Sequence, residues 1–221
     1  MKKMMILQSV LLIILVSLTY SQEQKPVPLF AIVHLGVLNT DRENFSDNYG
    51  SSTGFVFGGG LGLQVSNSIA LVVKATYFHK SGIPLIQTYS YNISTGTTTL
   101  VSEKKEGTAS YTQWLVNAGL QISILDLNQF SVAANGGVLY SVVSEELNDA
   151  PAIFYSANGK GIYGYFVGLN IEKKILESQL SPFLEIQYNL TRSGLTEAPQ
   201  PVGGHFGGMN ISLGCKYNFH K

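Results

Sequence analysis

Apolar residues recur at every second position through most of the chain, and this period constrains the fold more than any other feature of the sequence. It is clearest near the C-terminal end, where Ile211 and Leu213 alternate with Asn210 and Ser212. Successive side chains of a β-strand point to opposite faces, so such a segment forms a strand with one apolar face. The pattern therefore predicts an all-β fold.

Eight segments carry this alternation, and turn-forming residues separate them. They are residues 28–38, 54–65, 69–80, 110–124, 130–142, 160–172, 180–190 and 205–219. The connections between them alternate between long and short, which is typical of an up-and-down meander with one plain end and one end of long loops. No connection has the pattern of a crossover helix, so a parallel α/β sheet is not expected.

The composition of the two strand faces indicates which face points outward. The chain has 45% hydrophobic but only 13% charged residues, and the apolar faces of the predicted strands carry no Asp, Glu, Lys or Arg. The opposite faces are small or polar with few charges, whereas a water-facing surface carries roughly 25–35% charged residues. They suit the interior of an eight-stranded barrel, which side chains fill. We therefore predict an eight-stranded antiparallel up-and-down transmembrane β-barrel.

Aromatic residues on the apolar face are sorted by height along this barrel. One group lies near the long loops and another near the short turns, with aliphatic residues between them. The first group is Phe55, Phe57, Tyr77, Trp114, Tyr140, Tyr163, Tyr165 and Tyr188, and the second is Phe130, Tyr217 and Phe219. Two such girdles around an aliphatic belt are typical of membrane barrels.

The first residues have the pattern of a secretory signal peptide. A basic start precedes an apolar run from Ile6 to Leu18, and small residues lie just before Gln22. The run is shorter than the about 20 residues that a transmembrane helix needs. We expect residues 1–21 to be a cleaved signal peptide and residues 22–221 to be an exported barrel domain.

The export signal, the eight-strand rhythm and the last strand together resemble the small outer-membrane β-barrel proteins of the OmpX and OmpA-barrel type, in the version common among Bacteroidetes. The resemblance implies a place in the bacterial outer membrane, with outer-membrane lipid around the barrel. It also implies that the aromatic end of the last strand, Tyr217 and Phe219, is the signal that the barrel-assembly machinery reads. His220 and Lys221 follow Phe219, which departs from the family pattern.

Two charged residues are predicted at mid-height inside the barrel, Lys74 on the third segment and Glu185 on the seventh. An unpaired charge in a narrow lumen is very costly, so the two side chains are expected to form an ion pair. Other inward polar residues would extend this network: Gln113, Asn117, Gln187 and Asn210. Inward glycines would make room for the rings of Phe166, Phe183 and Phe206. We expect a lumen closed by side chains, and a proton or ion pathway is the alternative.

The connection 81–109 is the longest, and it contains a second alternating pattern. Residues 86–93 and 97–101 are predicted to form a hairpin above the membrane, with Tyr89 and Tyr91 as exposed anchors. An unpaired sheet edge can accept a strand from another protein. We expect a structural or adhesion role in which this loop binds an extracellular protein or another surface ligand. A solvated loop without a partner is the alternative.

Two further classes of function stay open. His79 and Ser81 have the His-x-Ser spacing of some outer-membrane lipid A deacylases, but no acidic residue is predicted beside them to orient the histidine. A periplasmic lipocalin-like carrier would share the alternation with its faces reversed. Three of the four histidines, His34, His205 and His220, have no Cys, Asp or Glu at metal-ligand spacing. No metal, cofactor or catalytic site is therefore predicted, and the protein is expected not to be an enzyme. Lys+Arg and Asp+Glu are both 14, which leaves no basic surplus for nucleic acid.

Overall fold

The computed structural model describes residues 28–42, 45–149, 153–158, 161–175, 178–195 and 202–219. The predicted signal peptide lies outside these residues. None of the helices within the described ranges has the length and apolar character needed to cross a membrane.

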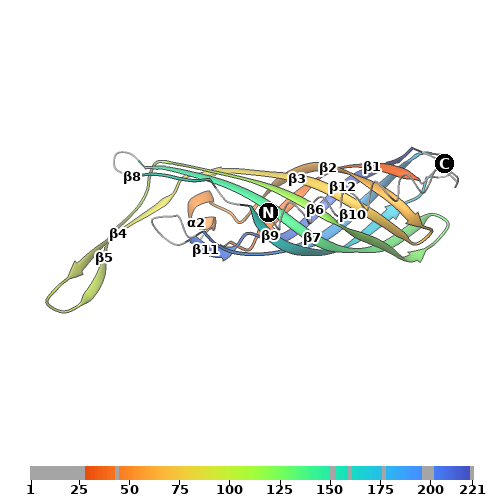
Figure 1. Cartoon of the computed structure of the whole chain (residues 1–221). Helices are drawn as coiled ribbons and strands as arrows, with labels where there is room; N and C mark the ends of the chain where they lie inside the picture. The colour runs from red at the N-terminus through yellow and green to blue at the C-terminus, as the bar shows by residue number, and fades with distance from the viewer. Residues whose placement is uncertain are drawn as a thin grey trace.

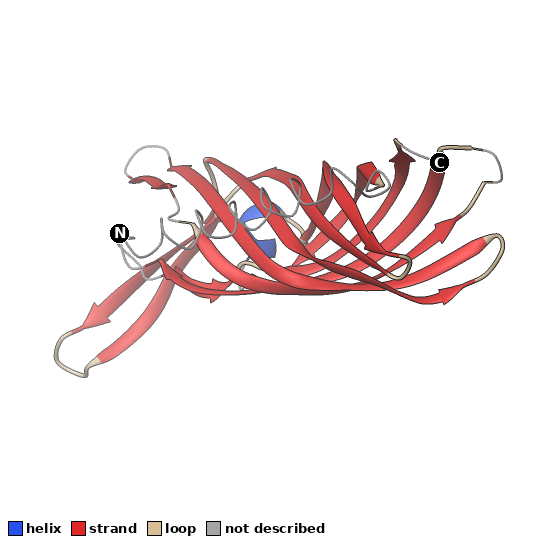
Figure 2. Ribbon diagram, turned by 45° about the vertical axis from the view of Figure 1, so that its right-hand side comes forward, coloured by secondary structure: helices blue, strands red, loops and turns tan. Residues whose placement is uncertain are grey.

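Among the described residues, eight long strands close into a barrel (Figures 1 and 2). They are β1 (Leu29–Thr40), β2 (Thr53–Ser66), β3 (Ile69–Gly82), β6 (Thr108–Asp126), β7 (Phe130–Asp149), β9 (Ile162–Lys173), β10 (Leu180–Leu195) and β12 (Gly208–Asn218). Each pairs antiparallel with the barrel strand that precedes or follows it in the chain. The first and last strands pair with each other, with Val33 opposite Cys215, and this ladder closes the sheet. The predicted all-β, up-and-down barrel is confirmed.

The short elements gather at the end of the barrel that carries the long connections (Figure 1). They are the helix α2 (Phe45–Tyr49) and the strands β4 (Leu85–Asn92), β5 (Thr97–Lys105), β8 (Ile153–Asn158) and β11 (Val202–His205). Strands β4 and β5 form a separate two-stranded sheet, the predicted hairpin, whereas β8 pairs antiparallel with the end of β7 and β11 with the end of β10.

Most predicted strand limits lie within two residues of those in the structure, and three differ by more: the ends of β7 and β10 and the start of β12. The segment 205–219 is interrupted, because β12 begins only at Gly208, whose φ of 135° lies in a region that glycine alone adopts readily. Strand β7 continues to Asp149, beyond the predicted end at residue 142. Its alternation also continues, since Val143 and Glu145 are buried whereas Val142 and Glu146 are exposed.

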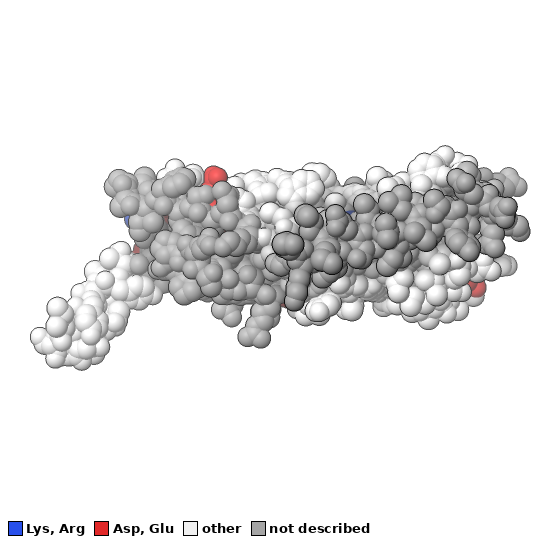
Figure 3. Space-filling view, in the orientation of Figure 1, with Lys and Arg blue, Asp and Glu red and all other residues white. Residues whose placement is uncertain are grey.

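The side chains have the predicted inside-out arrangement. Outward-facing Leu35 and Leu213 are 65% and 61% exposed, whereas inward-facing Gln113 and Asn117 are 0% and 2% exposed. On the visible face, the described part of the barrel wall is almost free of charge (Figure 3). A polar interior and an apolar exterior suit a barrel in lipid, and they are the reverse of a lipocalin-like carrier.

Aromatic side chains stand on the outer face near both ends of the barrel. Phe57, Tyr77 and Trp114 form a row across β2, β3 and β6, with ring centroids 5.2 and 4.8 Å apart. Tyr217 and Phe219 lie at the opposite end, with their rings 5.2 Å apart. The two predicted aromatic groups therefore occupy different heights, at the levels where amphipathic rings meet lipid headgroups.

Candidate functional site

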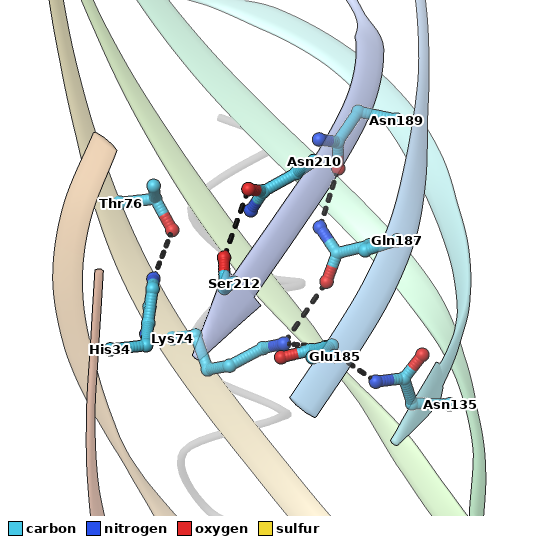
Figure 4. Close-up of polar contacts among 9 residues, drawn as sticks. All are labelled: His34, Lys74, Thr76, Asn135, Glu185, Gln187, Asn189, Asn210 and Ser212. Carbon is cyan, nitrogen blue, oxygen red and sulfur yellow. Dashed lines mark hydrogen bonds and ion pairs between the residues drawn. The ribbon is translucent and has the colours of Figure 1, made fainter. Parts of the chain in front are cut away.

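Lys74 of β3 and Glu185 of β10 meet in the middle of the lumen (Figure 4). Lys74 Nζ donates a hydrogen bond to Glu185 Oε1 and another to Gln187 Oε1, the second at 3.0 Å. Asn135 Nδ2 donates to the same carboxylate oxygen at 2.6 Å. The two ionic side chains are only 7% and 5% exposed. Removing either partner would leave a buried charge without compensation, which is strongly destabilising.

The polar network around this pair includes some of the predicted residues but not all. Gln187 Nε2 donates to Asn189 Oδ1 at 2.6 Å, and Asn210 Oδ1 accepts from Ser212 at 2.9 Å. Gln113 lies nearer the long-loop end, where its Nε2 donates to the carbonyl oxygen of Phe206 at 2.7 Å. Asn117 is buried, and its Oδ1 accepts no hydrogen bond within the described structure. The polar side chains at mid-height in the lumen thus come mainly from β10, β3 and β12.

The lumen is closed at the level of the ion pair. The cavity beside Lys74 and Glu185 has a volume of about 10 Å³, which is room for about one water molecule. Phe183 fills the space left by Gly214, where a Cβ atom would lie 2.7 Å from Cε1 of the ring. Phe30, which the sequence analysis did not single out, occupies the space beside Gly62 in the same way.

A second buried ion pair closes the mouth of the barrel at the long-loop end. Arg42 Nη2 donates to Glu145 Oε2 at 2.6 Å, and the hydroxyl of Tyr49 donates to Glu145 Oε1 at 2.8 Å. We call Arg42 and helix α2 the mouth plug. Sequence reasoning missed this site because it placed Glu145 in a loop, although continued alternation from Leu139 would have assigned Glu145 to the inner face of β7.

Aromatic rings surround the charges of the mouth plug. The guanidinium carbon of Arg42 lies 5.4 and 5.5 Å from the ring centroids of Tyr111 and Phe206. Burial lowers the pKa of Arg42, but the Glu145 carboxylate outweighs it and holds this pKa above its ordinary value. Burial raises the pKa of the Tyr49 hydroxyl, and the Glu145 charge raises it further. Arg42 therefore stays charged and Tyr49 stays a hydrogen-bond donor.

A third ion pair lies toward the end with the short turns. Lys216 Nζ is hydrogen-bonded to Glu172 Oε2 and lies 5.1 Å from the ring centroid of Phe30. Below it the barrel widens into an open basin of about 480 Å³, at whose rim Lys174 pairs with Asp126. Inward charges are thus paired at three heights, and the closed section lies between the mouth plug and this basin.

The hairpin β4–β5 has two chemically different faces. Tyr89 lies opposite Leu100 and Tyr91 opposite Thr98, so these four side chains share one face. Tyr89, Tyr91 and Leu100 are 56%, 63% and 48% exposed. The other face carries hydroxyl and amide groups: Ser90, Asn92, Thr97 and Thr99. The hairpin projects beyond the barrel (Figure 1), and the face of it that Figure 3 shows is almost free of charge.

His79 and Ser81 lie on the outer face of β3 near the loop end. Ser81 Oγ is 3.2 Å from His79 Nε2, and His79 Nδ1 is 3.2 Å from Thr112 Oγ1. The imidazole therefore lies between two hydroxyl groups. Within the described part of the chain, no group of three or more His, Cys, Asp or Glu side chains is arranged to hold a metal ion.

Comparison with solved structures identifies the architecture. No protein-family model and no curated protein sequence matches the chain. The crystal structure of Neisserial surface protein A superposes with a TM-score of 0.55 at 10% identity, over 86% of this chain and 97% of that one. The crystal structure of the outer membrane protein OprG from Pseudomonas aeruginosa gives 0.53 at 12% identity, over 88% and 97%. The chain has the fold of a small outer-membrane β-barrel.

The last strand of the barrel, β12, leads into the residues predicted to be the assembly signal. Tyr217 and Phe219 are 39% and 44% exposed on the outer face. Tyr217 lies opposite Ala31 of β1 and Leu180 of β10, at the short-turn end of the closing ladder. Both rings are accessible from the lipid side.

Proposed function

We propose that the protein is a non-enzymatic barrel of the bacterial outer membrane, exported by its signal peptide, that binds an extracellular partner through the hairpin β4–β5. The observation that carries this proposal is the exposed face of Tyr89, Tyr91 and Leu100, which stands clear of the barrel. Exposed apolar clusters mark interaction sites, and tyrosine is enriched in protein interfaces. The closed lumen supports the proposal, because it leaves little space for a solute to pass.

The free edge of β4 favours an extended polypeptide segment as the partner. Strand β4 contains no charged residue and no proline. Strand β5 has a register irregularity opposite Thr88 and Tyr89, and it ends in Glu103, Lys104 and Lys105. Bulges and charges protect an edge strand against pairing, so β4 is the less protected edge. A partner strand would gain main-chain hydrogen bonds there and side-chain contacts with the tyrosines.

The proposal is tested by adhesion of cells that display the protein. Deleting residues 86–104 should abolish binding to extracellular matrix proteins, while the barrel keeps its folded migration in cold detergent. Tyr91→Ser should weaken binding about tenfold or more, as expected for an aromatic anchor. Ser90→Ala, on the opposite face of the same strand, is the matched control and should bind as the wild type does. Unchanged adhesion after the deletion would remove the hairpin from the proposed function.

A lipid-hydrolysing enzyme is the second candidate, and the contacts of His79 favour it. A serine hydroxyl beside an imidazole can act as a nucleophile with its general base. The third group is the hydroxyl of Thr112, whereas an effective triad uses a carboxylate to stabilise the imidazolium. We therefore rank this candidate second. Mass spectrometry of lipid A from cells that overexpress the protein or Ser81→Ala should give identical acyl patterns, and loss of an acyl chain only with the wild type would establish the enzyme.

A further inference from the structure

A single carboxylate holds both ends of the mouth plug. Glu145 accepts hydrogen bonds from Arg42, just before helix α2, and from Tyr49, the last residue of that helix. Phe45, at the start of α2, stacks on Tyr49 with ring centroids 4.3 Å apart and meets Tyr111 edge-on at 5.0 Å. The helix has only five residues, too few to be stable alone. We call the hydrogen bonds from Arg42 and Tyr49 to Glu145 the Glu145 latch. The position of α2 therefore depends on this latch and on the aromatic packing around the helix.

The mouth plug also contacts the stem of the surface hairpin. Gly82, the last residue of β3, lies so close to α2 that a Cβ atom there would be 2.6 Å from the Cα atom of Tyr49. The side chain of Asn48 accepts a hydrogen bond from the backbone nitrogen of Leu85, the first residue of β4, at 3.4 Å. Asn48 and Tyr49 are adjacent in the chain. One peptide unit thus connects the Glu145 latch to the point where the hairpin leaves the barrel.

We propose that the Glu145 latch sets the direction of the hairpin and couples the hairpin to the barrel mouth. Displacing the stem moves Asn48, and with it Tyr49, out of reach of Glu145. Conversely, opening the latch removes the support against which Gly82 and Leu85 pack, and the hairpin then samples other directions. This inference rests on the proposed function only in that it takes the hairpin as the binding element.

The charges of the latch make the coupling switch-like. Once Tyr49 and the aromatic rings move away, Arg42 and Glu145 meet water at the mouth, where an ion pair contributes little. In the closed position the same pair is buried, and its side chains are 8% and 2% exposed. Intermediate positions would leave Arg42 buried without its partner, which is costly. The plug is therefore expected in or out of the mouth, with few states between.

A distance measurement between spin labels tests the coupling without any partner molecule. The labels are placed at Thr95→Cys in the turn of the hairpin and at Leu190→Cys on the outer wall of β10, in a Cys215→Ser background. The protein is folded into lipid nanodiscs. With Glu145 present we expect one narrow distance distribution. Glu145→Leu removes both hydrogen bonds with little change in volume, and the distribution should become about twice as broad.

Two further variants separate the latch from general damage. Glu172→Leu, which strands Lys216 at the other end of the lumen, is the matched control and should leave the hairpin distance unchanged. Gly82→Ala keeps the Glu145 latch residues but pushes α2 from the stem, so it should broaden the distribution as Glu145→Leu does. Unchanged distributions in folded Glu145→Leu and Gly82→Ala would overturn the inference. Since no ligand is involved, that result would leave the binding proposal untouched, and failed adhesion would leave this inference untouched.

Discussion

At the scale of single residues, buried ion pairs stabilise the folded barrel only while both partners are present. Lys74→Met should destabilise the folded barrel by about 3–5 kcal/mol, because it leaves the Glu185 carboxylate buried and uncompensated. The double variant Lys74→Met, Glu185→Met should recover most of that loss, since two apolar side chains of similar volume replace the pair. Urea titration in lipid vesicles, followed by tryptophan fluorescence, measures the free energy of unfolding of both variants. Equal losses in the single and double variants would contradict the pairing argument.

A single residue of the mouth plug, Tyr49, is expected to make the stability of the folded protein decline at alkaline pH. The pKa of Tyr49 is raised in the folded protein, so the unfolded chain loses this proton first, near the usual tyrosine value of about 10. Its contribution is therefore fully present below about pH 10 and declines as the pH rises further. Thermal unfolding followed across this range should show a steeper alkaline loss for the wild type than for Tyr49→Phe. Parallel pH profiles would show that Tyr49 adds nothing.

At the scale of elements, the predicted strands were correct because two constraints act on the same residues. The period of two determines which side chains share a face. The outer face meets lipid and must be apolar, whereas the inner face can be polar, so Leu213 could be assigned to the outside and Ser212 to the lumen from sequence. Helix α2 could not be predicted, because five residues do not form a stable helix alone, and its contacts with Glu145 and Tyr111 come from residues distant in the sequence. Mid-lumen partners such as Asn135 also depend on the stagger of strands, which alternation alone does not determine.

Glycines within the barrel strands give a testable prediction at this scale. A Cβ atom at Gly36 would lie 2.7 Å from the Cα atom of Ser212 on β12, across the ladder that closes the barrel. Backbone cannot yield as a flexible side chain can, so Gly36→Ala should destabilise the barrel by about 1–3 kcal/mol. Gly136→Ala is the matched control, because its nearest neighbour would be 3.4 Å away, an ordinary contact. Equal unfolding midpoints for the two variants would show that the closing ladder tolerates a wider spacing.

At the scale of the whole molecule, the barrel is closed in series rather than at one gate. The mouth plug and the Lys74–Glu185 pair with its phenylalanines each cross the interior at a different height, above the basin that the Lys216–Glu172 pair lines. Resistance in series is set by its narrowest part, so opening one layer leaves the others in place. We therefore expect no steady conductance from the wild type in planar bilayers. The variant Glu145→Leu should also stay silent, because the cavity at mid-height, about 10 Å³, still holds only about one water molecule. Steady single-channel currents from the wild type would mean that the interior rearranges in the membrane, and the role of the lumen would have to be revised from a filled support for the surface hairpin to a path for ions.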